Sequence, residues 1–548
     1  MRTIESVLRR IDGKRYRAYR ELLGAMQRVE NVTVRVIRVQ PDPYAPPSVV
    51  RVETKVEAPH WALQNPIALA DWCYRRLFEE LRALSKKVGD GNSGYLGVPR
   101  PGPIMIRRSG FEIDALGKAV ARIWVGLPSR RRCIAADIAE SILLKAIPRA
   151  IKRVLDSIRI RRDELQRHIN AWIEQEYIRR FLRDKGLIAF IGDGSVLPRR
   201  AGSSHEPDPE AVPFESPKSL SIEIELPTGR VVRGMALRRG VTLIMGAAFH
   251  GKTTLLRAIA AGVYNHVPGD GRELVVTVRN AFYVATEEGR YVHCVDISPF
   301  LRAAPRVADP RCFTTSNASG ATSVLAALQE AIEVGAELVL IDEDTVATNA
   351  LYHDDRVSKL IPEESITPLS RVSRALVEHG VSLVIASRGS LDLVAAADTV
   401  IVMHRYRPVD ATDIAKTLSE GVDTANTYRY TPPGKRFLRH VHPPRRVRAR
   451  MLRIEIRNPD FVLDLSPDIQ LYEETQVNTL REVLRMLRTF EGKSVAEVAR
   501  EIENTIVSKG FSALLGREPG PDLGEVRALD VAFVLNRLPS ALASIVSG

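Results

Sequence analysis

The sequence predicts an α/β protein with a central α/β core, a basic α+β domain before the core and a smaller α/β region after it. Three observations lead to this prediction. Residues 246–253 read G-x-x-x-x-G-K-T, which is the spacing of a phosphate-binding loop. The apolar run 241–245 before the loop predicts a buried strand, and the run 255–262 after it predicts a helix. A second apolar run, 338–341, ends in the adjacent carboxylates of Asp342 and Glu343.

The loop at 246–254 predicts the binding of ATP and Mg²⁺. Its glycines let the backbone wrap closely around a polyphosphate with N–H groups pointing inward, and the following helix N-terminus favours negative charge. Lys252 would reach the terminal phosphates, and the Thr253 hydroxyl would coordinate Mg²⁺. A chance match is the alternative, which the flanking strand and helix disfavour. The residues expected to bind nucleotide here are Gly246, Ala247, Ala248, Phe249, His250, Gly251, Lys252, Thr253 and Thr254.

Asp342 and Glu343 are expected to complete a catalytic set with Lys252. Side chains at the end of such a strand project over the phosphate-binding loop, so Asp342 is expected to hold Mg²⁺ directly or through water. Glu343 is expected to polarise the attacking water as a general base. An acidic cap on the strand is the alternative, which the upstream phosphate-binding loop disfavours.

A serine-rich turn lies upstream of that strand. Ser319 and Gly320 precede a predicted helix at 324–333. A serine hydroxyl and free N–H groups at a helix N-terminus can bind a phosphate. Ordinary capping of the helix by Ser319 or Thr322 is the competing interpretation.

The composition is that of a soluble globular protein. The chain has 548 residues, of which 45% are hydrophobic and 26% charged. There is no run of about 18 apolar residues and no signal-peptide pattern at the start, so we expect a cytoplasmic protein without a membrane segment. The cysteines show no C-x-x-C spacing, and we therefore expect buried free thiols rather than a zinc site or a disulfide. They are Cys73, Cys133, Cys294 and Cys312.

Shifts in composition suggest five segments. A turn-rich and proline-rich stretch after residue 196 marks the first boundary. The expected division is an N-terminal basic α+β domain at 1–200, a connector at 201–220, the ATPase core at 221–425, a basic linker at 426–450 and a C-terminal region at 451–548.

Positive charge is concentrated outside the core. The net charge is +13, and residues 1–200 carry 39 Lys and Arg against 22 Asp and Glu, while residues 401–450 carry 11 against 4. The rest of the chain is therefore acidic. Basic segments beside an acidic nucleotide-binding core favour a protein that acts on nucleic acid. Surface ion-pair networks of the kind found in thermophilic proteins are the alternative.

Two short segments are candidates for nucleic-acid contact. Arg130, Arg131 and Arg132 follow a predicted strand and could bind the sugar-phosphate backbone. In the basic linker, arginines that include Arg445 and Arg446 follow Tyr428, Arg429 and Tyr430, a mixture that can grip phosphates and stack bases. A solvated basic turn and a solvated connector are the respective alternatives.

These motifs and several others resemble a known family, the predicted ATPases of the ABC class. In the core the resemblance lies at 250–256, 262–273, 296–300, 318–320 and 341–349. Outside the core it lies at 40–48, 126–128, 192–199 and 464–466. The resemblance implies an ABC-type P-loop ATPase core with family-specific terminal regions and no transmembrane subunit. It also implies a homodimer, in which Ser319 and Gly320 of one subunit close over the nucleotide held by the other, and an association with RNA.

The sequence departs from general ABC patterns at one catalytic position. After the strand predicted at 381–386, transporters of this class place a switch histidine, whereas this chain has Ser387, Arg388, Gly389 and Ser390. Either Ser387 or Arg388 substitutes for the histidine, or ATP turnover is slow.

The function we expect is that of a soluble ABC-class ATPase, which hydrolyses ATP at sites shared across a homodimer and couples this to binding RNA or another nucleic acid. The alternative is an ATP-gated scaffold or timing factor that acts on a protein or ribonucleoprotein assembly. A small-molecule kinase is a third hypothesis, which the serine turn disfavours.

Overall fold

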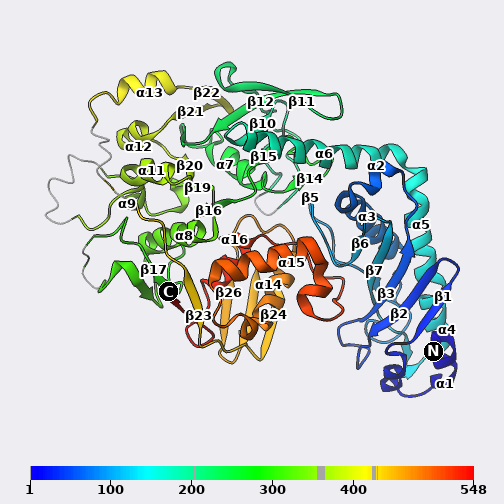
Figure 1. Cartoon of the computed structure of the whole chain (residues 1–548). Helices are drawn as coiled ribbons and strands as arrows, with labels where there is room; N and C mark the ends of the chain where they lie inside the picture. The colour runs from blue at the N-terminus through cyan, green and yellow to red at the C-terminus, as the bar shows by residue number, and fades with distance from the viewer. Residues whose placement is uncertain are drawn as a thin grey trace. The chain divides into compact units, whose positions relative to one another are not determined.

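The computed structural model describes residues 2–201, 204–302, 304, 307–353, 364–422, 428 and 430–548 (Figure 1). Arg429 of the predicted basic linker lies outside these residues. The chain divides into two compact units. The first comprises Met1–Trp172, Glu473–Thr479 and Asn504–Glu525, and the second comprises Ile173–Tyr472, Leu480–Glu503 and Val526–Gly548.

The boundaries of these units fall elsewhere than the segment boundaries expected from the sequence, for example near β10 and in the C-terminal region. The segment β10 (Leu187–Gly192) pairs with strands of the second unit, so that unit begins before residue 200. The C-terminal segment Glu473–Thr479 belongs to the first unit, where Glu473 accepts a 2.8 Å hydrogen bond from the buried Arg108 guanidinium. Asp71 is the second carboxylate partner of Arg108. Contacts between distant parts of the chain therefore decide membership of the units.

The first unit is built on an antiparallel sheet with the strand order β1-β2-β3-β7-β4, and β6 also pairs with β7. Side chains along β2 alternate between the core and the solvent: Val32, Val34 and Val36 are buried, while Arg35 is exposed. This alternation turns one face of the sheet toward the core. The strands of this unit are β1 (Met26–Val29), β2 (Val32–Arg38), β3 (Ser48–Lys55), β4 (Leu96–Gly97), β5 (Ile104–Met105), β6 (Phe111–Ile113), β7 (Lys118–Val125), β8 (Ser129–Arg130) and β9 (Cys133–Ile134). Its helices include α1 (Ile4–Ile11), α2 (His60–Leu63), α3 (Pro66–Leu84), α4 (Ala136–Ser141) and α5 (Ile147–Ile160).

The second unit contains a six-stranded sheet with the order β16-β19-β20-β13-β21-β22. All neighbours in it are parallel except β21 and β22, which form an antiparallel pair. The strands are β13 (Val241–Met245), β16 (Ala281–Val284), β19 (Leu338–Asp342), β20 (Ser382–Ala386), β21 (Thr399–His404) and β22 (Arg407–Asp410). The central strands are continuous apolar runs, as expected for a parallel sheet buried on both faces. The predicted α/β class is confirmed.

Helices pack on this sheet and fix the site. The helix α7 (Lys252–Ala261) contacts β16, β19 and β20, and α11 (Leu369–Glu378) contacts β13 and β20. The remaining helices in or entering this unit are α6 (Arg162–Asp184), α8 (Gly320–Val334), α9 (Thr348–Leu351), α12 (Leu391–Ala396), α13 (Thr412–Leu418), α14 (Glu474–Arg485), α15 (Val495–Leu515) and α16 (Ala528–Leu535).

Smaller sheets surround the core of the second unit. An antiparallel sheet has the order β11-β12-β10-β15, and another has the order β24-β25-β26. The strands not yet described are β11 (Ser221–Glu225), β12 (Val231–Arg238), β14 (Asn265–His266), β15 (Val275–Thr277), β17 (Val292–Val295), β18 (Phe313–Thr315), β23 (Arg436–Arg439), β24 (Arg446–Arg450), β25 (Arg453–Arg457), β26 (Phe461–Asp464) and β27 (Ser544–Ser547). No helix among the described residues is long and apolar enough to cross a membrane.

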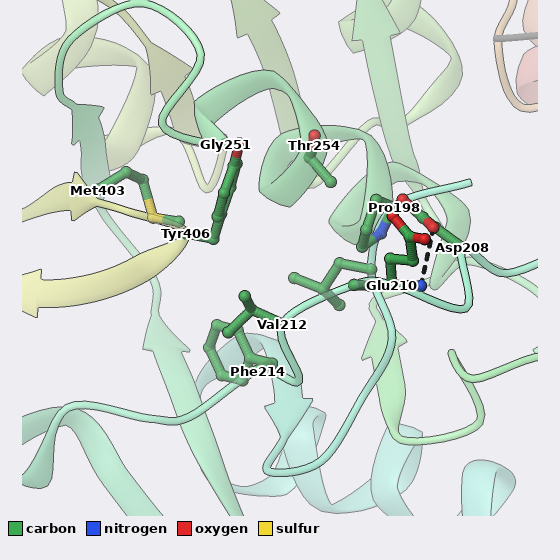
Figure 2. Close-up of a pocket in the computed structure, with 11 residues that line it drawn as sticks. Pro198, Asp208, Glu210, Val212, Phe214, Gly251, Thr254, Met403 and Tyr406 are labelled. Atoms are coloured by element: carbon green, nitrogen blue, oxygen red, sulfur yellow. Dashed lines mark hydrogen bonds between the residues drawn. The ribbon is translucent and has the colours of Figure 1, made fainter. Parts of the chain in front are cut away.

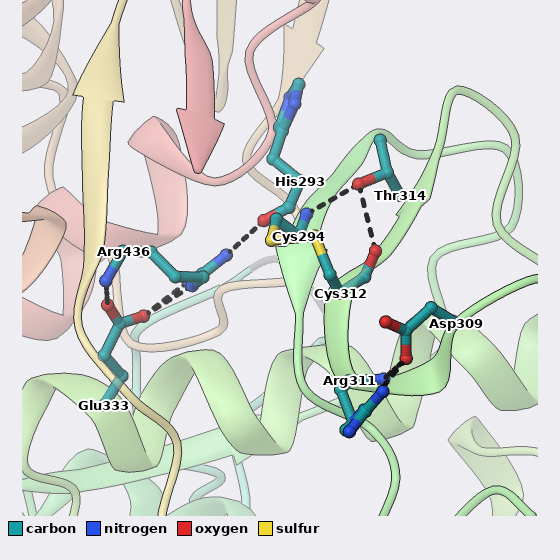
Figure 3. Close-up of a disulfide and its surroundings, with 8 residues drawn as sticks. All are labelled: His293, Cys294, Asp309, Arg311, Cys312, Thr314, Glu333 and Arg436. Atoms are coloured by element: carbon teal, nitrogen blue, oxygen red, sulfur yellow. Dashed lines mark hydrogen bonds and ion pairs between the residues drawn. A yellow bond between two sulfur atoms is a disulfide. The ribbon is translucent and has the colours of Figure 1, made fainter. Parts of the chain in front are cut away.

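One cysteine prediction is wrong. Cys294 and Cys312 form a disulfide, whereas Cys73 and Cys133 are free as expected, with Cys73 buried and Cys133 half-buried. The antiparallel pairing of β17 with β18 brings the two half-cystines together although 18 positions separate them in sequence. Figure 3 shows the bridge beside Arg436, whose guanidinium donates to the His293 carbonyl oxygen at 2.8 Å. Sequence spacing alone carried no sign of this pairing.

Candidate nucleotide-binding site

The predicted phosphate-binding loop joins the end of β13 to the start of α7. Both glycines of this loop have positive φ angles, which other residues rarely adopt. Gly246 has φ = +140°, and a Cβ there would lie 2.5 Å from the carbonyl oxygen of Met403. Gly251 has φ = +99° and precedes the first residue of α7. Such positive φ values favour glycine, so this loop shape depends on the glycines that the motif predicts.

The loop is tied to the turn between β21 and β22. The Arg405 N–H donates to His250 Nδ1 at 3.1 Å, and the Tyr406 N–H donates to the His250 carbonyl oxygen at 3.3 Å. Lys252 lies across the loop, with Nζ donating to the carbonyl oxygens of Gly246 (2.8 Å) and Ala247 (3.1 Å). Phe249 at the tip is 93% exposed. The loop is thus held from the side of His250 and open at its tip.

Sheet register places Asp342 at the same level as the start of this loop. Asp342 on β19 and Ile244 on β13 both stand opposite Ala386 of β20, one on each side. Two strand spacings therefore separate them, about 10 Å. Parallel strands end at a common edge, so the Asp342 carboxylate and the phosphate-binding loop share one edge of the sheet.

Asp342 has the surroundings of a cation ligand. Its side chain is buried, and Oδ1 accepts a 3.2 Å hydrogen bond from the Asp344 N–H, while Oδ2 has no hydrogen-bond partner among the described residues. A buried carboxylate oxygen without a partner is costly unless a cation satisfies it. The described residues hold no cluster of three or more His, Cys, Asp or Glu that suits a metal. A Mg²⁺ ion held by Asp342, Thr253 and nucleotide oxygens needs no such cluster.

Glu343 is held by three hydrogen-bond donors. Its Oε2 accepts from Ser387 Oγ at 2.6 Å and from the Arg388 N–H at 2.7 Å, and its Oε1 accepts from the Tyr352 hydroxyl at 2.8 Å. Burial raises the pKa of the Glu343 carboxyl, but these donors outweigh burial and hold its pKa below the ordinary value. The carboxylate is therefore ionised and oriented at neutral pH.

Two of these donors come from the turn at 387–390, where the family resemblance leads us to expect a switch histidine and the sequence has none. Ser387 and Arg388 directly follow β20, and the Ser387 N–H donates to the Ile244 carbonyl oxygen of β13 at 2.9 Å. The end of the phosphate-loop strand, the Ser387 turn and Glu343 are thus joined by consecutive hydrogen bonds.

Tyr352 was not predicted as a site residue. It directly follows the short helix α9, nine positions after Glu343. Burial and the neighbouring Glu343 raise the pKa of its phenol, which keeps it protonated and able to donate. No motif marks this tyrosine, since only the fold of the segment after β19 brings it back to Glu343.

Ser319 and Gly320 lie at the start of α8. Ser319 is the N-cap residue, and its Oγ accepts from the Thr322 N–H at 3.4 Å, so the capping interaction considered from the sequence is present. The Ser319 side chain is nevertheless exposed, and Gly320 is half-buried. The N-terminus of this 15-residue helix is therefore accessible.

A pocket of about 360 Å³ adjoins the phosphate-binding loop (Figure 2). Gly251 and Thr254 line one side of it. The other lining residues come from the segment after β10 and from the β21–β22 hairpin, and they are Leu197, Pro198, Asp208, Glu210, Ala211, Val212, Phe214, Met403 and Tyr406. Apolar side chains and one aromatic ring at the turn suit a flat ring system beside a polyphosphate site.

The basic candidates are exposed but are not part of this site. Arg130 ends β8, and Arg131 and Arg132 form the turn before β9 in the first unit. Arg445 and Arg446 are exposed at the start of β24 in the second unit.

Fold and site together define a P-loop nucleotide-binding protein, and comparison with known families identifies which kind. The model described as the P-loop domain of the ABC ATPases matches residues 161–439, and the model described as the N-terminal part of ATPases of the ABC class matches residues 1–157. The chain belongs to this family, the ATPases of the ABC class. The expected family and its ABC-type core are confirmed.

Similarity to individual proteins covers less of the chain. The uncharacterized protein MJ1628 of Methanocaldococcus jannaschii is 32% identical over 253 residues, which is 44% of this chain and 56% of that protein. The match thus spans about half of that relative's length. MJ1267, an ATP-binding cassette of an ABC transporter solved in its ADP conformation, is 11% identical, with 44% of this chain and 98% of that chain covered and a TM-score of 0.26. A TM-score that low carries no weight here.

Proposed function

We propose that this ABC-class protein hydrolyses ATP with Glu343 as the general base. The observation that best supports this proposal is that three hydrogen bonds orient the Glu343 carboxylate directly after β19, next to Asp342. Lys252 and the loop amides would bind the phosphates, and Thr253 and Asp342 would hold Mg²⁺. Bound Mg²⁺ would neutralise charge on the phosphate oxygens.

Ser387, Arg388 and Tyr352 take the orienting role in this proposal. In place of a histidine, a hydroxyl and a backbone N–H hold one oxygen of Glu343, and a phenol holds the other. These donors fix the carboxylate geometry at the cost of lower basicity, since hydrogen bonds to the charged form stabilise it. Turnover is therefore expected to be slow.

The nucleoside of ATP is expected to occupy the pocket beside Gly251 and Thr254. The Tyr406 ring would offer it a flat contact, and Val212 and Phe214 would supply apolar surface.

The proposed ATPase reaction is tested by separating binding from hydrolysis. Lys252→Ala should abolish ATP binding, whereas Glu343→Gln should bind ATP and lose about 10²–10⁴-fold in turnover. Lys416→Ala, an exposed lysine on α13, is the matched control and should behave as the wild type. Normal hydrolysis by Glu343→Gln would refute the assignment of the general base.

We propose further that two copies pair around the nucleotide. The accessible N-terminus of α8, with the exposed Ser319 before it, is available to a phosphate bound by a second copy. Light scattering should then show that Glu343→Gln dimerises when ATP and Mg²⁺ are added. A monomer under those conditions would contradict the shared site.

Dimer closure is proposed to be coupled to RNA or another nucleic acid. If nucleic acid prefers the open or the closed dimer, ATP and nucleic acid must change each other's affinity equally. The net charge of +13 supports a polyanionic partner. Fluorescence anisotropy with single-stranded RNA at rising salt, with and without ATP, tests this. Protein contacts that survive nuclease treatment, without ATP-sensitive RNA binding, would instead favour the scaffold hypothesis.

A further inference from the structure

The three-stranded sheet β24-β25-β26 exposes one strongly basic face. Along β24, Arg446, Arg448 and Arg450 are exposed, while Val447 between them is buried. Along β25, Arg453 and Arg457 are exposed, while Ile454 and Ile456 are buried. Successive side chains on a strand point to opposite faces, so all five arginines share the outer face. We call this surface the arginine face: Arg446, Arg448, Arg450, Arg453 and Arg457.

The pairing register brings like charges together on this face. Arg446 stands directly opposite Arg457, and Arg450 stands directly opposite Arg453. Like charges directly opposite one another in an antiparallel pair destabilise it, by up to about 1 kcal/mol per pair. Stability of this sheet therefore does not explain the two arginine pairs, and an anionic ligand would relieve their repulsion.

Three acids lie among or beside the five arginines, and they leave this surface with a net positive charge. Arg457 forms a 3.1 Å ion pair with Asp460, and the acids in register on the outer face are Glu455, opposite Arg448, and Asp464, opposite Arg453. The side chains of Arg446, Arg448, Arg450 and Arg453 make no hydrogen bond or ion pair with any described residue. Their guanidinium groups are free to bind another molecule.

The spacing and the chemistry fit a phosphodiester backbone. Alternate residues on a strand lie about 7 Å apart, so β24 presents a straight row of three cations over roughly 14 Å. All five cations are arginines, whose planar forks bind phosphate oxygens through two hydrogen bonds at once. Sites for single-stranded nucleic acid combine positive charge with a surface that follows the backbone, and a row of arginines along one strand supplies both.

We propose that the arginine face binds the backbone of single-stranded nucleic acid. The proposal rests on the nucleic-acid coupling of the proposed function and assigns its contact surface. RNA and single-stranded DNA share the phosphate chemistry, so both are substrates for the test, and the 2′-hydroxyl decides any preference between them.

The test uses the full chain and a fluorescent 20-nucleotide RNA, with DNA of the same sequence in parallel. Arg446, Arg448 and Arg450 are changed together to Gln. Each lost phosphate contact removes about 0.7 from the slope of log K against log salt for a single strand, so the slope should fall by about 2 and affinity at 0.1 M salt by about 100-fold. Rates of ATP hydrolysis should not change in the absence of nucleic acid.

Two controls separate this surface from net charge and from misfolding. Changing Arg9, Arg10 and Arg311 to Gln alters the net charge equally at exposed arginines already held in ion pairs, and should change affinity less than about twofold. Arg448→Gln and Glu455→Gln alter cross-strand neighbours and should act in opposite directions, with weaker binding for the first and tighter binding for the second. Damage to the sheet would weaken binding in both.

The outcomes distinguish this proposal from the proposed function. If the triple variant binds RNA as tightly as the wild type does, the arginine face is not the contact surface, while the proposed coupling of ATP to nucleic acid still stands. No nucleic-acid binding by the wild type would refute both, while ATP hydrolysis could still stand. Binding to phosphatidylserine vesicles or to polyglutamate that exceeds binding to RNA and DNA would also overturn the assignment.

Discussion

Tyr352→Phe removes one donor from Glu343 and leaves every other contact of its carboxylate in place. The hydroxyl of Tyr352 donates to Glu343 Oε1 at 2.8 Å, and Ser387 and Arg388 hold Oε2. A hydrogen bond to a charged group contributes about 1.5–3 kcal/mol, and because Glu343 is only half-buried we discount this to about 1 kcal/mol. That free energy corresponds to about a fivefold change in the protonation equilibrium of the carboxylate.

The direction of the effect follows from linkage. Tyr352 stabilises the ionised carboxylate, so its removal raises the pKa of Glu343 from its lowered value, and the general base is lost at a higher pH. Near pH 8, where Glu343 is ionised in both proteins, the kcat of Tyr352→Phe should stay within about twofold of that of the wild type, because higher basicity and weaker orientation of the carboxylate act in opposite directions. At pH values below the pKa of Glu343 in both proteins, the kcat of Tyr352→Phe should be about fivefold lower than that of the wild type.

The assay is the pH profile of kcat at saturating ATP. Tyr44→Phe, a change at a tyrosine that is 64% exposed, is the matched control and should leave the profile unchanged. Superimposable profiles for Tyr352→Phe and the wild type would refute the reasoning that the phenol tunes Glu343. A uniform loss at all pH values would instead indicate damage to the site.

The remaining predictions concern the loop, the disulfide and the first unit. Gly246→Ala should lose ATP binding, because the new Cβ would lie 2.5 Å from the Met403 carbonyl oxygen. Gly229→Ala, at a glycine with open space around it, should keep ATP binding. Calorimetric titration with ATP measures both variants. Cys294→Ser should lower the free energy of unfolding by about 3 kcal/mol, because it removes the bridge that closes this loop. A denaturant titration measures the change, and Cys133→Ser, at a free cysteine, should have little effect. Equal stability of Cys294→Ser and the wild type would contradict the prediction. Changing Arg130, Arg131 and Arg132 to Gln should lower the salt slope of RNA binding by about 2 if this turn contacts the backbone, and an unchanged slope would remove it from the interface.

The sequence was most informative where local patterns carry the chemistry. The apolar strand before residue 246, the two glycines with positive φ, and the carboxylates after β19 all follow from short motifs, and the structure has the expected elements there. These features depend on neighbours in the chain, which is why a single sequence reveals them.

Features that depend on contacts between distant residues escaped prediction. Tyr352 reaches Glu343 only through the path of the chain around α9, and Cys294 meets Cys312 only because β17 pairs with β18. The arginines of β24 were visible as a basic run, but the register that sets Arg446 against Arg457 was not. Glu473 likewise belongs to the first unit because it accepts a hydrogen bond from Arg108, which lies more than 300 positions earlier in the sequence.

The most direct measurement is a crystal structure of Glu343→Gln with ATP and Mg²⁺. The account predicts Mg²⁺ bound by Thr253 and Asp342, Lys252 on the terminal phosphates, and Ser319 of a second copy of the chain against the γ-phosphate. A triphosphate bound away from the loop at 246–254, or one closed over by no second copy, would contradict it.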